Sequence, residues 1–170
     1  VNFGIAYGMS GFGLAARLEI PREEADTFIA GYFERYPRVQ RYMRDTIDHA
    51  REFGYVQTVL GRRRYLPEVH AGNPNVRAAA ERMAINMPVQ GTAAEVIKIA
   101  MLRVQERLDD LGSEVKMLLQ IHDELVLECP LPEQEALEAM LHEIMPAVMP
   151  QLDVPLVVEL KSGARWGEFE

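Results

Sequence analysis

The sequence is poor in cysteine and contains no long apolar run. A single cysteine, Cys129, stands in 170 residues, which excludes a disulfide framework. No stretch reaches the roughly 18 to 20 uninterrupted apolar residues of a membrane span, and no segment resembles a signal peptide. Internal repeats and low-complexity tracts are also missing, which excludes a repeat architecture. We therefore predict an intracellular protein that does not enter a membrane.

The chain does have enough apolar residues to build a core. They make up 48% of the sequence, so a chain of this length is expected to fold as one domain, with room for an additional lobe. The first residue is Val1 rather than an initiator Met, and no helix cap precedes Phe3 and Tyr7, which have the pattern of a helix interior. We expect the chain to be a fragment of a longer polypeptide.

The net charge of −8 looks unsuitable for a nucleic-acid-binding protein, because phosphate contacts need Lys and Arg. The charge is, however, unevenly distributed. Residues 35–103 hold 12 basic and 6 acidic side chains, whereas residues 104–170 hold 4 basic and 15 acidic ones. A basic middle beside an acidic tail can bind a polyanion locally. The alternative is an ordinary solvated surface with chance clustering.

Helical spacing of apolar residues dominates most of the chain. It predicts helices that begin at Pro21 and at Pro37, the second of which ends at Gly54. A further helical pattern covers residues 132–149. These segments should supply most of the core.

The longest helical pattern begins at Asn73-Pro74, with Asn as the cap and Pro at the first helical position. Pro88 and Gly91 should kink or break this helix, because proline lacks the N–H that the helix needs. A second helix is then expected from about Thr92 onward.

Extended runs predict two hairpins and a final strand. Residues 55–66 surround a turn with three consecutive arginines, residues 115–129 form the clearest hairpin, and Val154–Leu160 alternates like a strand. The predicted fold class is α+β, mostly helical, with a small antiparallel sheet made of the second hairpin and the C-terminal strand. A change of lobe is expected near residues 67–76.

The tip of the second hairpin carries His122, Asp123 and Glu124. The flanking strands are apolar on both faces, so we expect them to be covered on both faces and to hold the carboxylates at a mostly buried tip. Such carboxylates need partners, and Mg²⁺ takes oxygen ligands of this kind together with substrate phosphates. The alternative is that Asp and Glu are simply favoured in turns.

Two further groups of residues suit nucleic-acid chemistry. Arg82, Asn86 and Gln90 follow one another at intervals of four on one broad helix face, where they could donate to minor-groove acceptors that every correct base pair presents. Phe3 and Tyr7 lie four apart beside glycines and could stack on a base or sugar. A solvated helix face and a packing face are the respective alternatives.

In order and spacing, these motifs resemble the family A DNA polymerases along essentially the whole chain. The matching segments are Asn2-Phe3-Gly4 with Tyr7-Gly8-Met9-Ser10, Thr58 with the turn Gly61-Arg62-Arg63-Arg64, Glu81-Arg82-Met83-Ala84 with Asn86 to Ala94, and Gln120 to Val126.

The resemblance implies roles for individual residues. Asp123 would hold a catalytic metal ion, Glu124 would support it, and His122 would contact the primer end. Phe3 would lie by the incoming sugar and Tyr7 in the insertion site. The expected DNA contacts are Arg64, Arg82, Asn86 and Gln90.

The resemblance also implies the setting of the chain. Residues 1–73 would belong to the fingers subdomain and residues 74–170 to the palm of a DNA-directed DNA polymerase that acts in replication or repair. Its cofactor would be two Mg²⁺ ions, with one further aspartate supplied by an upstream part of the same polypeptide. The expected partners are primer-template DNA and a deoxynucleoside triphosphate, in a monomer of the bacterial cytoplasm or nucleoid, or of phage origin.

Three alternatives remain open on the sequence alone. A metal phosphohydrolase could use the pair His122-Asp123, although that chemistry usually has its pair on a helix among further ligating histidines. A non-catalytic DNA-binding module would bind without metal. A single-subunit RNA polymerase shares the general architecture, but the residues of the motifs Arg82 to Ala94 and Gln120 to Val126 match the DNA enzymes better.

Overall fold

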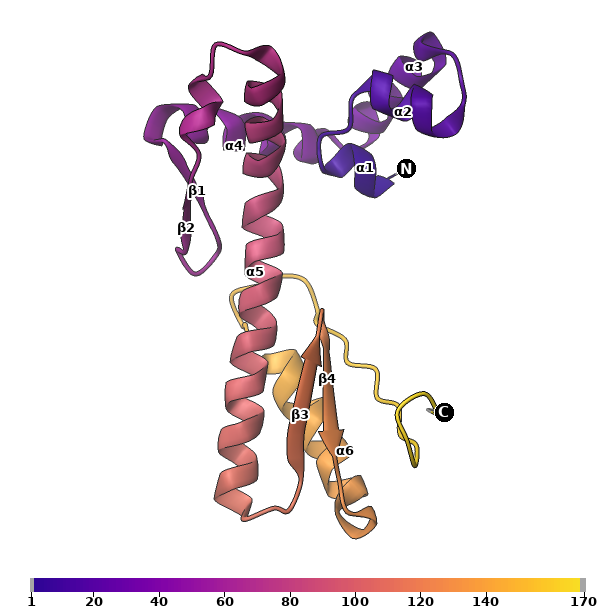
Figure 1. Ribbon diagram of the computed structural model, residues 1–170, viewed down its shortest axis with the longest axis vertical. Coiled ribbons are helices and arrows are strands. Elements are labelled where there is room, and N and C mark those ends of the chain that lie inside the picture. Colours follow the sequence, from indigo (N-terminus) through magenta and orange to yellow (C-terminus); the bar gives the residue numbers. More distant parts are fainter. Residues whose placement is uncertain (1, 169–170) are drawn as a thin grey trace. The chain divides into compact units, whose positions relative to one another are not determined.

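The computed structural model describes residues 2–168, which fold into two compact units with their border between residues 92 and 93. Helix α5, Pro74–Leu111, contains the border between them (Figure 1). The class is α+β and mostly helical, with two separate two-stranded antiparallel sheets. The predicted fold class is therefore confirmed. Within the described residues, no helix has the length and apolarity needed to cross a membrane.

The first unit begins with three short or medium helices, α1 (Asn2–Ala6), α2 (Gly11–Leu18) and α3 (Arg22–Arg35). They bury Ile5, Leu14 and Ala25 in a small core of their own. Helix α4, Pro37–Phe53, then ends at Gly54, whose φ of 76° is the predicted left-handed stop.

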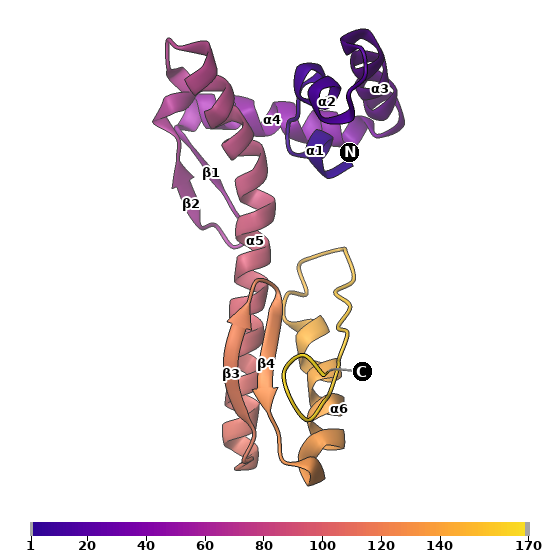
Figure 2. The ribbon, with the colours of Figure 1, turned by 45° about the vertical axis from the view of Figure 1, so that its right-hand side comes forward.

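The second half of this unit packs a hairpin and a 3₁₀ turn against α4 and the start of α5. Strands β1 (Tyr55–Gln57) and β2 (Arg63–Tyr65) pair in an antiparallel register, and η1 covers Pro67–His70. A buried cluster joins these elements; its members are Ala50, Val56, Leu66, Val69, Ala80 and Ala84. Figure 2 shows the hairpin alongside the first half of α5.

The second unit places a hairpin and a helix against the second half of α5. Its elements are β3 (Lys116–Ile121), β4 (Glu124–Glu128), η2 (Leu131–Glu133), α6 (Gln134–Ile144) and η3 (Met145–Ala147). The core consists of Val104, Leu108, Val115, Met140 and Leu141.

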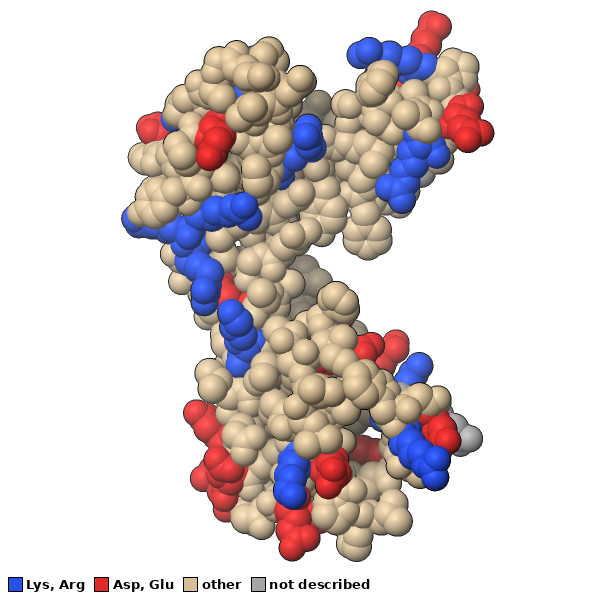
Figure 3. All heavy atoms as spheres, viewed as in Figure 1, with Lys and Arg blue, Asp and Glu red and all other residues tan. Residues whose placement is uncertain are grey.

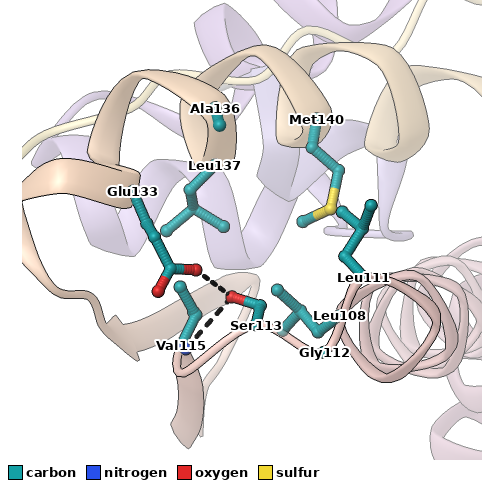
Figure 4. Close-up of a pocket in the computed structure, with 9 residues that line it drawn as sticks. All are labelled: Leu108, Leu111, Gly112, Ser113, Val115, Glu133, Ala136, Leu137 and Met140. Carbon is teal, nitrogen blue, oxygen red and sulfur yellow. Dashed lines mark hydrogen bonds between the residues drawn. The ribbon is translucent and has the colours of Figure 1, made fainter.

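A cavity of about 230 Å³ opens beside this core, lined mainly by apolar side chains (Figure 4). At its rim the Ser113 hydroxyl donates to the Glu133 carboxylate and accepts from the Val115 N–H. These bonds tie the connection after α5 to the start of α6.

The predicted break in the long helix is wrong. α5 continues through Pro88 and Gly91 as one helix of 38 residues and ends before Gly112, whose φ is +60°. Its flanks hold it in place, since Ala84 and Thr92 are both buried by tertiary contacts. Packing on both sides of Pro88 therefore outweighs the loss of one backbone hydrogen bond.

The predicted final strand is also wrong. Val154–Leu160 forms no strand, because β3 and β4 pair only with each other and no third ladder is present in the described chain. The alternation instead gives one-sided burial: Leu156 and Leu160 pack on apolar clusters, whereas Val157 is exposed. An alternating pattern indicates two faces, but a strand also needs a hydrogen-bonded neighbour.

Candidate active site

The first group of candidate residues lies in the second unit, at the tip of the β3–β4 hairpin. Ile121 pairs with Glu124, so His122 and Asp123 form a two-residue turn. His122 adopts a left-handed backbone with a φ of 52°, which is uncommon outside glycine and suits a tight hairpin turn. The Gln120 side chain donates to the His122 carbonyl and closes the tip. The tip thus carries carboxylates on two consecutive residues, Asp123 in the turn and Glu124 at the first position of β4.

The expected burial of this hairpin is wrong. His122, Asp123 and Glu124 are all exposed. Leu118 and Leu119 are also exposed, with relative exposures of 50% and 45%. One face of the hairpin packs on the core through Met117 and Leu127, whereas a two-stranded sheet leaves the other face open. The tip therefore presents its carboxylates to solvent, where a cation and its remaining ligands could reach them.

The metal-binding capacity of the tip is incomplete. Carboxylate oxygens are suitable Mg²⁺ ligands, so the residues fit the ion in kind. Within residues 2–168, however, no three His, Cys, Asp or Glu side chains gather into a group that could hold a metal ion. Asp123 and Glu124 can provide only part of a ligand shell.

A separate group of candidate residues lies in the first unit, on α5. Because α5 is continuous, Arg82, Asn86 and Gln90 do share one broad helix face. Arg82 and Gln90 are exposed, and Asn86 is half-buried. The Asn86 Oδ1 is buried without a hydrogen-bond partner among the described residues, so its capacity to accept a hydrogen bond is unmet there.

The two predicted nucleotide-binding aromatics lie on α1 and just after it. The rings of Phe3 and Tyr7 are stacked, with centroids 6.4 Å apart, and Phe3 is 80% exposed. Gly8 has a φ of +82°, and a Cβ there would come within 3.2 Å of the Arg82 Cγ. The absence of a side chain at Gly8 thus lets the end of α1 lie against Arg82 on α5.

One residue near this face was not predicted to have a site role. Tyr42 on α4 donates its hydroxyl to the Ile85 carbonyl at 2.9 Å, next to Asn86. Burial raises the pKa of Tyr42, the neighbouring Tyr7 raises it further, and a hydrogen bond with Thr46 partly offsets both. In the sequence Tyr42 belongs to an apolar helical stripe, and no signal there indicates a bond to a carbonyl 43 residues away.

Arg64 lies near the same helix face. Its guanidinium donates to the Met83 sulfur at 3.3 Å, so β2 rests over α5 one residue from Arg82. Figure 3 shows basic side chains gathered over the β1–β2 hairpin. The structure therefore brings Arg64 close to the helix of Arg82, Asn86 and Gln90 within the first unit.

Comparison with known proteins identifies the family. The family model described as "DNA polymerase family A" matches residues 1–168. The chain belongs to DNA polymerase family A. It is 51% identical over 98% of its length to the thermostable DNA polymerase I of Thermus thermophilus, and 47% identical over 98% to DNA polymerase I of Mycobacterium leprae.

A solved family A structure is also similar. The chain matches the POL domain of Pol1 from M. smegmatis, in a complex with DNA primer-template and dNTP, with a TM-score of 0.89 and 49% identity over 92% of this chain and 27% of that one. The chain covers 20% and 18% of the Thermus thermophilus and Mycobacterium leprae polymerases. This family A chain therefore spans about a fifth of the length of its curated relatives.

Proposed function

We propose that this chain is the part of a DNA-directed DNA polymerase that supplies one metal-binding edge of the active site and the helix that checks the new base pair. The family match over residues 1–168, which includes the His122-Asp123-Glu124 segment, is the observation that supports this most strongly. The reaction is attack of a primer 3′-hydroxyl on the α-phosphorus of a deoxynucleoside triphosphate, with pyrophosphate leaving. We assign the segments before and after about residue 73 to fingers and palm.

Each group of residues has a separate task in this proposal. Asp123, with Glu124 as a weaker neighbour, holds Mg²⁺ at the exposed hairpin tip, and His122 contacts the primer end. Bound Mg²⁺ would supply the positive charge that favours ionisation of the attacking hydroxyl and offsets the charge developing on the phosphates. A further aspartate from an upstream segment of the same polypeptide completes the ligands, consistent with the partial shell at the tip.

The first unit positions the reactants. Phe3 lies by the incoming sugar and Tyr7 stacks in the insertion site, for which their exposed, stacked rings are suited. Arg82, Asn86 and Gln90 donate to minor-groove acceptors of the new pair or the primer-template duplex. Arg64 binds the DNA backbone. The protein works as a monomer in the bacterial cytoplasm or nucleoid.

The Asp123→Asn change in the intact polymerase tests this function. We expect incorporation to fall by at least about two orders of magnitude while primer-template affinity changes little, because a lost metal ligand removes transition-state stabilisation whereas binding rests on many phosphate contacts. Single-turnover incorporation and DNA titration measure the two quantities.

Glu124→Gln is the matched comparison and should reduce incorporation less. Comparable turnover in Asp123→Asn would contradict the metal assignment. A larger loss in Glu124→Gln than in Asp123→Asn would exchange the roles of the two carboxylates. Hydrolysis of a nucleotide without primer would instead favour the phosphohydrolase alternative.

A further inference from the structure

The turn of the β1–β2 hairpin is fixed to helix α5 by a contact that the functions above do not use. It involves two buried threonines, Thr58 in the turn and Thr92 on the helix, which are 3% and 7% exposed. Between them lies Gly91, the residue next to Gln90.

Thr92 joins the turn to the helix with a single hydroxyl. It donates to the Pro88 carbonyl one helical turn earlier at 2.6 Å, and it accepts from the Val59 N–H of the hairpin turn at 3.1 Å. A hydroxyl can make both bonds at once, whereas an isosteric valine can make neither. Without it, the Val59 N–H would be a partly buried donor with no partner, which is costly.

Thr58 closes the turn from the inside. Its hydroxyl accepts from the Arg62 N–H at 3.1 Å, its own N–H donates to the Arg62 carbonyl at 3.0 Å, and its carbonyl accepts from the Gly61 N–H at 3.0 Å. Three bonds therefore set the start of the arginine run, Arg62 to Arg64.

Gly91 provides the space for this approach. A Cβ at Gly91 would lie only 2.7 Å from the Thr58 Cγ2, which is too close for two carbon atoms that are not bonded to each other. The turn therefore rests directly on the helix backbone at Gly91, and any side chain there would push it outward.

A second tie fixes the other end of the hairpin, where the Arg64 guanidinium contacts Met83. From Met83 to Thr92 the helix rises about 13 Å. This stretch contains Asn86 and Gln90, and Arg82 immediately precedes it. The hairpin is thus held at both ends of the segment that bears the proposed base-pair contacts.

We propose that Thr92, Thr58 and Gly91 are positioning residues that hold the arginine turn in register with the helix, so that the turn binds a backbone phosphate while Gln90 and Asn86 read the pair. This inference rests on the proposed polymerase function. A phosphate contact fixes the register of a protein on a duplex, and base contacts can discriminate only once that register is set. A loosened turn therefore weakens phosphate binding first.

Thr92→Val in the intact polymerase is the primary test, measured by primer-template affinity over a range of salt concentrations. We expect affinity to fall roughly tenfold and the slope of log affinity against log salt to become shallower by about one unit for each phosphate that the variant no longer binds. Thr92→Ser keeps the hydroxyl and should restore both quantities. A purely structural role would lower thermal stability without changing the salt slope.

Thr27→Val is the matched control. Thr27 on α3 also donates its hydroxyl to the carbonyl four residues earlier, that of Glu23 at 2.8 Å, but it is exposed and this bond stays within one helix. This variant should leave the salt slope unchanged. Combining Thr92→Val with Arg64→Ala should weaken binding by less than the sum of the two separate effects, because both act on the same phosphate contact.

A second pair of variants tests the position of the turn without removing the Thr92 hydroxyl. Gly91→Ala should weaken DNA binding by displacing the turn, and Thr58→Ser should rescue it, because Ser removes the clashing Cγ2 but keeps the hydroxyl that bonds Arg62. No rescue, or a Thr92→Val slope equal to that of Thr92→Ser, overturns the positioning role. An unmodified polymerase that neither binds nor extends a primer-template would instead overturn the proposed function.

Discussion

At the scale of single residues, Phe3 is the candidate site residue whose side chain is best placed to contact a ligand. Its ring is 80% exposed and stacked on Tyr7, so one apolar face is free for a ligand. In the proposed site, the Phe3 ring lies beside the 3′ position of the incoming sugar. When a nucleotide lacks its 3′-hydroxyl, the apolar Phe3 ring offers no polar group to replace that hydroxyl. A hydroxyl on the ring could supply one.

Phe3→Tyr in the intact polymerase should therefore raise the acceptance of dideoxynucleotides relative to deoxynucleotides, by about an order of magnitude or more. Competition between the two substrates during primer extension measures this ratio. Phe12→Tyr, which adds the same hydroxyl to an exposed ring on α2 outside the proposed site, is the control and should leave the ratio unchanged. An unchanged ratio in Phe3→Tyr would remove Phe3 from the sugar site.

Candidate site residues could be predicted from the sequence where they belong to a local motif. The tip His122-Asp123-Glu124 and the four-residue spacing of Arg82, Asn86 and Gln90 are visible in the sequence. Two hydrogen bonds are not visible there: the Tyr42 hydroxyl donates to the Ile85 carbonyl, and the Val59 N–H donates to the Thr92 hydroxyl, and each bond joins residues more than 30 positions apart. Such pairs are set by tertiary packing, and no periodicity reports them.

At the scale of elements, the continuity of α5 decides how its polar face acts. With no break at Pro88, Gln90 keeps its place on the face of Arg82, so both can contact one duplex. Minor-groove acceptors are placed alike in all correct pairs and displaced in mispairs. Contacts to them should favour the correct pair.

Gln90→Ala and Arg82→Ala should thus slow extension more from correctly paired ends than from mispaired ones, which reduces discrimination between them. Pre-steady-state rates on matched and mismatched primers give both numbers. Gln105→Ala, on the same helix but in the second unit, is a control that should change neither rate. Equal reductions on both primers would leave Gln90 and Arg82 only a structural role.

The connection between α5 and β3 depends on Glu133. Its carboxylate accepts from the Ser113 hydroxyl, and weakly from the Glu114 N–H at 3.4 Å. Glu133→Ala should cost about 1–2 kcal/mol of local stability, which corresponds to roughly 5- to 30-fold faster hydrogen exchange at the amides of Glu114 and Val115. Glu135→Ala, an exposed neighbour, should change neither amide. Unchanged exchange in Glu133→Ala would show that these bonds do not hold the connection.

Helices and strands were predictable where the spacing of apolar residues agrees with the capping and terminating residues at their ends. Asn73 caps α5 as expected, with its side chain accepting from the Asn75 N–H, and Gly54 ends α4 in a left-handed conformation. Pro88 and Val154–Leu160 were mispredicted, because in both places long-range contacts or their absence outweigh the local signal. A proline can stay in a well-packed helix, and an alternating run without a partner strand does not form a ladder.

At the scale of the whole molecule, the uneven charge is explained by the proposed division of work. The basic residues 35–103 include the arginine turn and the polar face of α5, whereas the acidic residues 104–170 include the carboxylate tip. Figure 3 shows a basic cluster over the β1–β2 hairpin and side chains of both signs over the second unit. Cations at the tip would offset part of the negative charge that opposes DNA.

The family could be predicted from the order of the motifs, because four short segments in one order are far more specific than any of them alone. Burial of the hairpin could not be predicted in the same way. The apolar faces of β3 and β4 indicated cover on both sides, yet Leu118 and Leu119 are exposed in the second unit. A pattern gives the preference of a face for burial but not the element that buries it.

The exposed hairpin leads to the prediction for these 170 residues as they stand: expressed alone, they should not extend a primer. Asp123 and Glu124 form no larger ligand group within the described chain, so they cannot hold two Mg²⁺ ions against a triphosphate. Removing even one partner of such a site usually costs orders of magnitude in rate. The open face around Leu118 and Leu119 should also favour aggregation.

Primer extension with Mg²⁺, with and without an added upstream polymerase segment that carries the further aspartate, measures this directly. We expect no extension by the chain alone and, at most, weak DNA binding that falls steeply with salt, because the basic residues 35–103 can still contact phosphates while the acidic residues 104–170 repel them. Extension that appears only with the upstream segment would support the shared metal site. Robust extension by the chain alone would mean that residues other than Asp123 and Glu124 complete the ligand set within these 170 residues.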